Sequence, residues 1–369
     1  MVENLTPSVV RAFLPQAHSF ESRPLGNGLI HQTVLVTTGH GEFVFQRLNH
    51  NVFPDLSAVM RNIGQVTGFL RQNGIATLSF LTTTGGTYLF QDEDGYFWRC
   101  SENISDAATY DVPPTPAHLK NAAREFARFA NSLSSAHGLK LHPTIPDFHH
   151  TPRRFEAMEK AWESAPRERQ SVADFYALRL AAGGFDEWGL SGLLAPHVPQ
   201  AVSHNDTKLN NCLFKGNSEE VICVIDLDTV MPGSWLCDFG DLCRTSICPL
   251  PEDTEELDKI DVDLDRFQAL VEGYAETFGE EIRTEERERM VYSVFLLTYE
   301  LALRFFTDHL QEDRYFGVKY PDHNLARTRA QLTLALKILD KRQEMERIVA
   351  AAFASATEGE EEQAQLSSP

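Results

Sequence analysis

The fold is decided by residues 201–228, which read AVSHNDTKLNNCLFKGNSEEVICVIDLD. A polar loop leads into an apolar run at 212–214, a Lys-Gly-Asn turn follows, and a second apolar run at 221–225 ends in Asp226. Two short strands joined by a turn form a hairpin, and both acidic clusters would lie at one end of it. The sequence therefore predicts a polar site that contains Asp206, Asn211 and Asp226.

These residue types fit phosphoryl transfer, which needs little covalent help from a protein. One carboxylate orients the attacking hydroxyl and accepts its proton, while oxygen ligands hold Mg²⁺ on the phosphates of ATP. Asp206 is the candidate base, and Asn211 and Asp226 are the candidate metal ligands, because Mg²⁺ prefers a few oxygen ligands. Each residue alone could instead cap or end a local element. Their joint HxDxxxxN spacing, followed by an acid, favours kinase chemistry.

The part upstream of this stretch predicts an antiparallel sheet with one helix. Residues 22–48 alternate between apolar and polar and turn at Gly39-His40-Gly41, which indicates a β-hairpin. Residues 56–70 carry apolar side chains at steps of three and four, which indicates an amphipathic helix. Further strands are expected at 78–81, 87–91 and 95–100.

The downstream part predicts a mainly helical lobe, with helical periodicity at 119–133, 267–279, 286–309 and 324–348. The expected class is α+β with two lobes. The divisions are an N-terminal nucleotide-binding lobe at 1–100, a hinge at 101–115, a helical lobe with the catalytic loop and acceptor site at 116–354, and an acidic disordered tail at 355–369. Residues 141–200 receive no role from their pattern.

Composition excludes several classes of function. A net charge of -20 and a pI near 5.0 would repel nucleic acid. There is no long apolar run, so we expect no transmembrane helix, no membrane partner and a cytoplasmic location. The six cysteines lack CxxC spacing and are expected to be reduced, buried thiols. The oligomeric state stays open.

The motifs resemble the aminoglycoside phosphotransferase and choline kinase-like superfamily, and most of all its N-acetylhexosamine 1-kinase branch. The resemblance runs from about residue 20 to 335 and implies a protein-kinase-like fold that uses ATP and Mg²⁺. The implied reaction phosphorylates the anomeric hydroxyl of an N-acetylhexosamine, either N-acetylglucosamine or N-acetylgalactosamine. Its matching segments are Leu25-Gly26-Asn27-Gly28-Leu29-Ile30, Phe45-Gln46-Arg47-Leu48-Asn49, Val52-Phe53, His204 to Asn211, Ile225 to Gly233 and Asp238-Phe239-Gly240-Asp241.

Asp238-Phe239-Gly240 matches the magnesium-binding motif of protein kinases. The family resemblance nevertheless implies a metal ligand at another position. In this family type the metal aspartate ends the strand after the catalytic loop, which is Asp226. Asp238 and Asp241 are therefore expected to hydrogen-bond the catalytic loop or cap a helix.

The nucleotide phosphates are expected to meet Gly26, Asn27 and Gly28, where glycines permit close backbone approach, although glycines in a turn are often only a turn. The usual lysine of the third strand and the glutamate of the next helix have no obvious equivalents. Strand alternation puts Gln46 at the lysine position. Arg47 or Lys208 could compensate for the missing charge.

The acceptor is expected beside Asp206. Asp228 follows the metal ligand by two residues and could bind sugar hydroxyls or an ammonium group. Arg304 lies one helical turn after Glu300, either as a ligand contact or as half of a surface Glu300–Arg304 pair. The resemblance favours Arg304 and Tyr315 as sugar contacts. A choline, homoserine or aminoglycoside kinase is the alternative, with Trp235 as a cation-π wall, and a non-catalytic kinase-like binding protein is a third possibility.

Overall fold

The computed structural model describes residues 5–26, 30–136, 138–185 and 201–366, and the chain forms two compact units. The first unit combines Met1–Ala107 with Ala136–Pro146 and Ile225–Met231, and the second contains the remainder. The first division, at Ala107, lies inside the segment expected to be the hinge. No pattern in the sequence indicates that two later segments join the first unit.

The first unit is built on an antiparallel sheet of six strands. Its hairpin of β2 and β3 pairs Val34 with Phe45, as the alternation of these residues predicts. In spatial order the strands are β1 (Phe20–Pro24), β2 (Gln32–Thr38), β3 (Gly41–Leu48), β6 (Phe97–Glu102) and β4 (Phe80–Leu81), and β5 (Phe90–Gln91) also pairs with β6.

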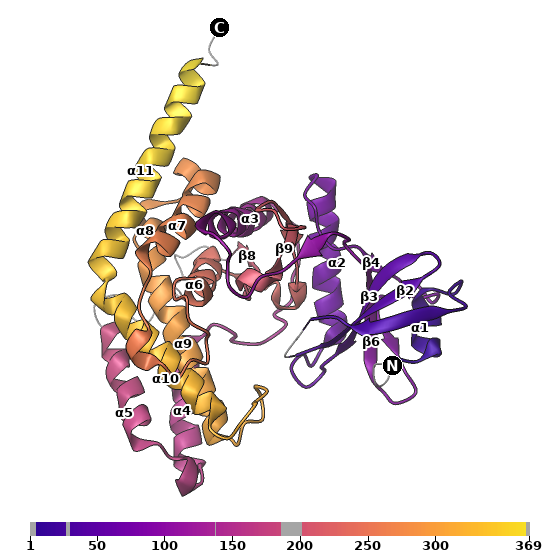
Figure 1. Cartoon of the computed structure of the whole chain (residues 1–369), viewed down its shortest axis with the longest axis horizontal. Helices are drawn as coiled ribbons and strands as arrows, with labels where there is room; N and C mark the ends of the chain where they lie inside the picture. The colour runs from indigo at the N-terminus through magenta and orange to yellow at the C-terminus, as the bar shows by residue number, and fades with distance from the viewer. Residues whose placement is uncertain (1–4, 27–29, 137, 186–200, 367–369) are drawn as a thin grey trace. The chain divides into compact units, whose positions relative to one another are not determined.

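Helices cover both faces of this sheet (Figure 1). The sequence did not predict α1 (Pro7–Phe13), which starts with Pro7 in its first turn and Thr6 as its cap. Val9, Val10 and Phe13 of α1 pack with the strand residues Val34, Val36, Phe45, Trp98 and Cys100 in a buried core. The predicted amphipathic helix, α2 (Leu56–Gln72), lies on the other side of the sheet.

Asn62 of α2 attaches the two later segments to the first unit. It is fully buried, and its Nδ2 donates to the carbonyl oxygens of His142 (2.8 Å) and Val230 (2.9 Å). Its Oδ1 accepts from the amide of His142 at 2.9 Å. Leaving such a buried amide unpaired would cost about 1–3 kcal/mol. One side chain therefore binds both the 136–146 and the 225–231 segments.

The second unit is mainly helical, and it contains the small hairpin of β9 and β10 that the sequence predicts. In this hairpin Cys212 pairs with Val224. The helix predicted at 324–348 is divided at Lys341. The helices are α3 (Pro116–Ser134), α4 (Thr151–Ser164), α5 (Val172–Ala181), α6 (Trp235–Ser246), α7 (Leu264–Phe278), α8 (Thr284–Arg287), α9 (Met290–Leu310), α10 (His323–Asp340) and α11 (Arg342–Leu366). The strands are β8 (Ala201–Ser203), β9 (Cys212–Lys215) and β10 (Val221–Val224), while β7 (Ala107–Ala108) and β11 (Met231–Gly233) lie where the chain passes between units.

The core of the second unit surrounds α9. This helix is long and apolar enough to span a membrane by those two criteria alone, but 83% of its most apolar window is buried inside the structure. Such burial is typical of a core helix. The antiparallel sheet and the helical second unit confirm the predicted α+β class.

The C-terminal segment differs from its prediction. The acidic composition of 355–369 suggested disorder, whereas α11 continues to Leu366. Alanine, glutamate and glutamine are strong helix formers, which favours a helix in this segment.

The cysteines match their prediction. All six lie in the described part of the chain and are free thiols, five of them buried. Burial raises the pKa of the Cys223 thiol to about 12, with a smaller contribution from Glu125. The Cys223 thiol is therefore protonated and unreactive at neutral pH.

Gly273 allows α7 to approach α3 closely. A methyl group at this position would meet the carbonyl oxygen of Lys120 and, at 2.7 Å, the Cβ of Ala123. We expect Gly273→Ala to lower the free energy of unfolding by about 1–3 kcal/mol through overpacking, although alanine is the better helix former. Gly68→Ala in α2 is the matched control, because no atom lies within 4 Å of its added methyl group. Equal urea midpoints for the two variants would contradict this packing.

Candidate active site

The predicted catalytic loop lies in the second unit, between β8 and the short helical turn Leu209–Asn211 that precedes β9. Its backbone is left-handed at Asn205, where φ is 64°. Non-glycine residues adopt this conformation at a cost and are found in it most often at functional sites. The surrounding contacts must therefore hold Asn205 in place.

The buried carboxylate of Asp238, on α6, provides most of these contacts. Its Oδ1 accepts from the amide of Asn205 at 2.7 Å and from Ser203 Oγ at 2.8 Å. Its Oδ2 accepts from the amide of His204 at 2.9 Å. Burial raises the pKa of Asp238, while the nearby His204 and these hydrogen bonds act in the opposite direction. The predicted structural role of Asp238 is confirmed by these bonds.

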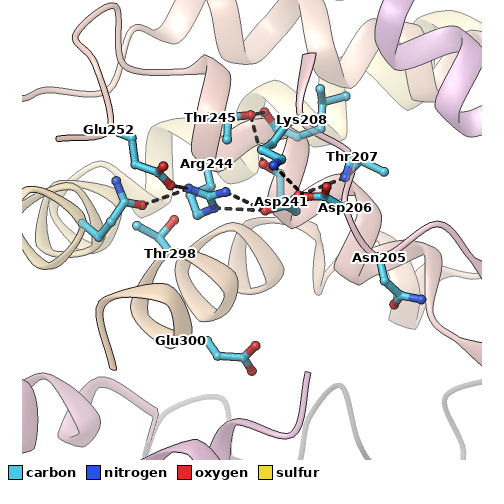
Figure 2. Close-up of polar contacts among 12 residues, drawn as sticks. Asn205, Asp206, Thr207, Lys208, Asp241, Arg244, Thr245, Glu252, Thr298 and Glu300 are labelled. Atoms are coloured by element: carbon cyan, nitrogen blue, oxygen red, sulfur yellow. Dashed lines mark hydrogen bonds and ion pairs between the residues drawn. The ribbon is translucent and has the colours of Figure 1, made fainter. Parts of the chain in front are cut away.

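Asp241, one turn further along α6, extends the same support. Its Oδ2 accepts from the amide of Thr207 at 2.9 Å, and its Oδ1 accepts from Nε and Nη2 of Arg244 at 3.0 and 2.9 Å. Arg244 is buried and also bonds to Glu252. Figure 2 shows this chain of charges running from Glu252 through Arg244 and Asp241 to the catalytic loop.

Asp206 lies at the end of this loop with about a quarter of its side chain exposed. Asn211 Nδ2 donates to its Oδ2 at 3.0 Å and to its carbonyl oxygen at 2.7 Å. Lys208 Nζ lies 3.2 Å from its Oδ1. Burial alone would raise the pKa of Asp206, but the charges of Lys208 and His204 and the bonds from Lys208 and Asn211 lower it. The carboxylate is therefore ionised at neutral pH, as a proton acceptor requires.

A cavity of about 280 Å³ borders the catalytic loop within the second unit. Lys208 and Asn210 line it on the side of the loop, and Thr245 and Cys248 line it at the end of α6. The cavity gives a small molecule space beside Lys208.

Asp226, the predicted metal ligand, lies in the first unit. Its backbone is left-handed, with φ 59°, and its side chain is exposed. A short helical turn, Leu227–Thr229, begins directly after it. Like Asn205, Asp226 is a non-glycine residue in a costly conformation, which supports a functional role.

The prediction that Asp228 contacts the acceptor needs correction. Asp228 is buried, and both of its oxygens accept from the guanidinium of Arg99, at 2.7 and 2.6 Å. His31 Nε2 lies 3.7 Å from its Oδ1. Burial alone would raise the pKa of Asp228, but Arg99 and His31 lower it strongly. The carboxylate is thus the counter-ion of Arg99 and ties the 225–231 segment to the sheet.

Gln46, at the position of the missing lysine, faces this ion pair. Its Oε1 accepts from Arg99 Nε at 2.9 Å and its Nε2 donates to Thr33 Oγ1 at 3.2 Å. Arg47 instead stacks over the ring of Tyr96, 4.4 Å from the ring centroid. Gly26 has a φ of 70° and open space around it. Asn27 and Gly28 lie outside the described residues.

Arg304 and Tyr315 are brought together in the second unit. The Arg304 guanidinium lies 5.7 Å from the ring centroid of Tyr315, and also near the rings of Phe148 and Phe316. Tyr315 is 45% exposed. Glu300 does not form the surface pair considered above, because it is buried and accepts from His149 and Thr151.

Trp235 is not a wall of a binding site, which corrects its prediction. It is buried, its indole Nε1 donates to Glu286 Oε1 at 3.0 Å, and its ring packs against Tyr274 and Phe278. As the first residue of α6 it belongs to the helical core.

The residues present fit a nucleotide-bound metal better than a resident one. Among the described residues, no group of three or more His, Cys, Asp or Glu could hold a metal ion. Mg²⁺ on a nucleotide takes most of its ligands from phosphate and water and needs only one or two protein oxygens. The amide nitrogen of Asn211 faces Asp206, which turns its Oδ1 away from that carboxylate. This orientation suits a metal ligand.

The comparison with protein families decides the class of the chain. Residues 21–276 match the phosphotransferase enzyme family. The chain belongs to this family. Its members have a kinase-like fold, which implies ATP as the phosphate donor and agrees with the carboxylate, amide and lysine gathered at Asp206.

Solved structures of the family share the fold at low sequence identity. An aminoglycoside phosphotransferase from Alicyclobacillus acidocaldarius is 16% identical and has a TM-score of 0.62. The match covers 94% of this chain and 98% of the Alicyclobacillus chain. A microcompartment-associated aminopropanol kinase is 14% identical over 92% and 98%, with a TM-score of 0.64. A choline/ethanolamine kinase family protein from Mesorhizobium loti is 17% identical over 95% and 96%, with a TM-score of 0.55.

Sequence reasoning missed two residues that organise the site. Arg99 is a cation within the apolar strand Phe97-Trp98-Arg99-Cys100, and that isolated charge was the available signal. His149 lies in the 141–200 region, where periodicity was uninformative, and its contact with Asn205 is visible only in the structure.

The pKa of Asp206 should depend on Lys208. Because Lys208 helps to keep this pKa below its ordinary value, the Asp206 carboxylate stays ionised as the pH falls. We expect Lys208→Met to raise it and to move the acid limb of the pH profile of kcat/KM to higher pH. Lys215→Met is the control, since Lys215 pairs with the exposed Glu220 instead. An unchanged acid limb in Lys208→Met would contradict the pairing.

Arg99 should be essential for the stability of the first unit. Arg99→Met leaves Asp228 buried without its counter-ion, and we expect it to lower the free energy of unfolding by about 3–5 kcal/mol. The double variant Arg99→Met, Asp228→Leu removes both charges and should lose much less. Calorimetry measures the unfolding free energy of the single and double variants. Equal losses of stability would show that the unpaired charge of Asp228 does not cause the destabilisation.

Proposed function

We propose that this phosphotransferase is an ATP- and Mg²⁺-dependent sugar 1-kinase that phosphorylates the anomeric hydroxyl of an N-acetylhexosamine. The observation that carries the kinase part is the set of contacts that holds an ionised Asp206 between Asn211 and Lys208. The resemblance of the sequence to N-acetylhexosamine 1-kinases supports the acceptor.

In the proposed mechanism Asp206 accepts a hydrogen bond from the attacking hydroxyl and takes its proton as the phosphoryl group is transferred. Asn211 and Asp226 are the proposed Mg²⁺ ligands, and the metal would neutralise charge on the phosphates. Lys208 is the proposed cation on the phosphate side, because the side chain proposed for the lysine position, Gln46, carries no charge. Gly26 would allow the backbone to approach the nucleotide.

The charge around Arg304 favours a neutral or anionic acceptor. Arg304 and Arg154 are both half-buried, and burial together with the charge of Arg304 lowers the pKa of Arg154. The nearby carboxylate of Glu300 is already bonded to His149 and Thr151. A cationic acceptor would meet repulsion here, whereas sugar hydroxyls could accept hydrogen bonds from Arg304 and the C–H face of the sugar ring could pack on Tyr315.

The groups expected to bind an ammonium ion are engaged elsewhere. Asp228 is the counter-ion of Arg99, and Trp235 lies in the helical core. An amino-alcohol kinase nevertheless remains the second candidate, because similar structures include an aminopropanol kinase and a choline/ethanolamine kinase family protein. Because ATP is the proposed donor, a cytoplasmic location is part of the proposal for either activity.

A panel of acceptors separates these candidates. ADP release should be fastest with N-acetylglucosamine or N-acetylgalactosamine and slow with choline, homoserine, aminopropanol and kanamycin. Asp206→Asn should lower kcat by about 10²- to 10⁴-fold, because the base is lost, while ATP still binds. Turnover confined to the amines would refute the sugar acceptor, and an active Asp206→Asn variant would refute the base.

A further inference from the structure

The peptide bond between Asn205 and Asp206 is held on both sides by histidines. Its carbonyl oxygen, from Asn205, lies 3.3 Å from His149 Nε2. Its amide group, from Asp206, donates to His204 Nδ1 at 3.2 Å. The orientation of this peptide plane helps to set the direction of the Asp206 side chain, because the amide nitrogen of Asp206 belongs to the plane and is bonded to its Cα.

His149 is itself fixed by a buried carboxylate. Its Nδ1 lies 2.9 Å from Glu300 Oε1, and Glu300 Oε2 accepts from Thr151 Oγ1 at 2.7 Å. Glu300 is 1% exposed. Burial alone would raise the pKa of Glu300, but the bond and charge of His149, the bond from Thr151 and the charge of Arg304 lower it. The carboxylate is therefore an ionised, immobile anchor for the imidazole ring.

The two ring nitrogens of His149 both face acceptors, a carboxylate oxygen and a carbonyl oxygen. One side chain thus links α9 to the catalytic loop through both of its ring nitrogens.

We propose that His149, oriented by Glu300, is a positioning residue that fixes the Asn205–Asp206 peptide for phosphoryl transfer. Asn205 is left-handed, so this peptide needs contacts beyond its own preference. Asp238 and Asp241 bind amides on either side of it, at Asn205 and Thr207. The carbonyl between these amides is held by His149. The proposal rests on the proposed kinase function.

Two conservative variants separate the two contacts of the ring. In His149→Asn the amide nitrogen replaces Nδ1, so the bond to Glu300 is kept and the bond to the Asn205 carbonyl is lost. In His149→Gln the amide nitrogen replaces Nε2, so the Asn205 bond is kept and Glu300 keeps only its bond from Thr151.

Activity and stability should therefore rank these variants in opposite orders. We expect His149→Asn to lower kcat by about 10- to 100-fold with KM values within about twofold of the wild type, and to melt close to the wild type. His149→Gln should keep most of kcat and melt at a lower temperature, because Glu300 Oε1 loses its contact with a ring nitrogen. A kcat that falls in step with melting temperature, or losses confined to KM, would show that His149 serves only packing or acceptor binding.

Amide hydrogen exchange tests the contact between His149 and the Asn205 carbonyl, which we call the clamp, and it needs no acceptor. Exchange in peptides that contain Asp206 should be faster in His149→Asn than in the wild type and near the wild type in His149→Gln. A wild type inactive on every acceptor would refute the proposed function while this exchange pattern still supported the clamp. Equal exchange in the two variants would overturn the clamp, whatever the acceptor.

Discussion

The buried carboxylate of Asp238 is the interaction on which the catalytic loop depends. A polar group in a protein interior is costly unless hydrogen bonds replace its hydration, and here Ser203, His204 and Asn205 all donate to Asp238. The same bonds satisfy amides in a loop that has no regular secondary structure and a left-handed residue. The position of Asp206 depends on these hydrogen bonds to Asp238. Contacts from Asp241 and His149 hold the neighbouring backbone groups of the loop.

Local features were predictable from the sequence because their causes are local. Alternation gave the β2–β3 hairpin, periodicity gave α2 and most of the helices, and the polar stretch from His204 to Asn211 gave the loop that carries Asp206. Pairings between distant residues were not predictable in the same way. Arg99 and Asp228 are separated by 129 positions, and His149 and Glu300 by 151. No pattern in either segment specifies its partner, so Asp228 was assigned to the acceptor when it serves the sheet.

The Asp228 pairing also explains how Asp226 is presented. Arg99 holds Asp228 and Asn62 holds the carbonyl of Val230, so the short 225–231 segment is fixed to the sheet and α2 of the first unit. Asp226 precedes these anchors with a left-handed backbone and an exposed side chain. A carboxylate presented in this way suits a metal bound to a nucleotide better than an acceptor contact. The acceptor would instead be selected by the cationic and aromatic group of Arg304, Arg154 and Tyr315.

The most direct measurement is a crystal structure with N-acetylglucosamine, Mg²⁺ and a non-hydrolysable ATP analogue bound. We predict that the C1 hydroxyl oxygen lies about 2.6–3.2 Å from a carboxylate oxygen of Asp206. A different hydroxyl at that position, or a sugar whose C1 hydroxyl lies beyond reach of Asp206, would contradict phosphorylation of the anomeric hydroxyl by this carboxylate.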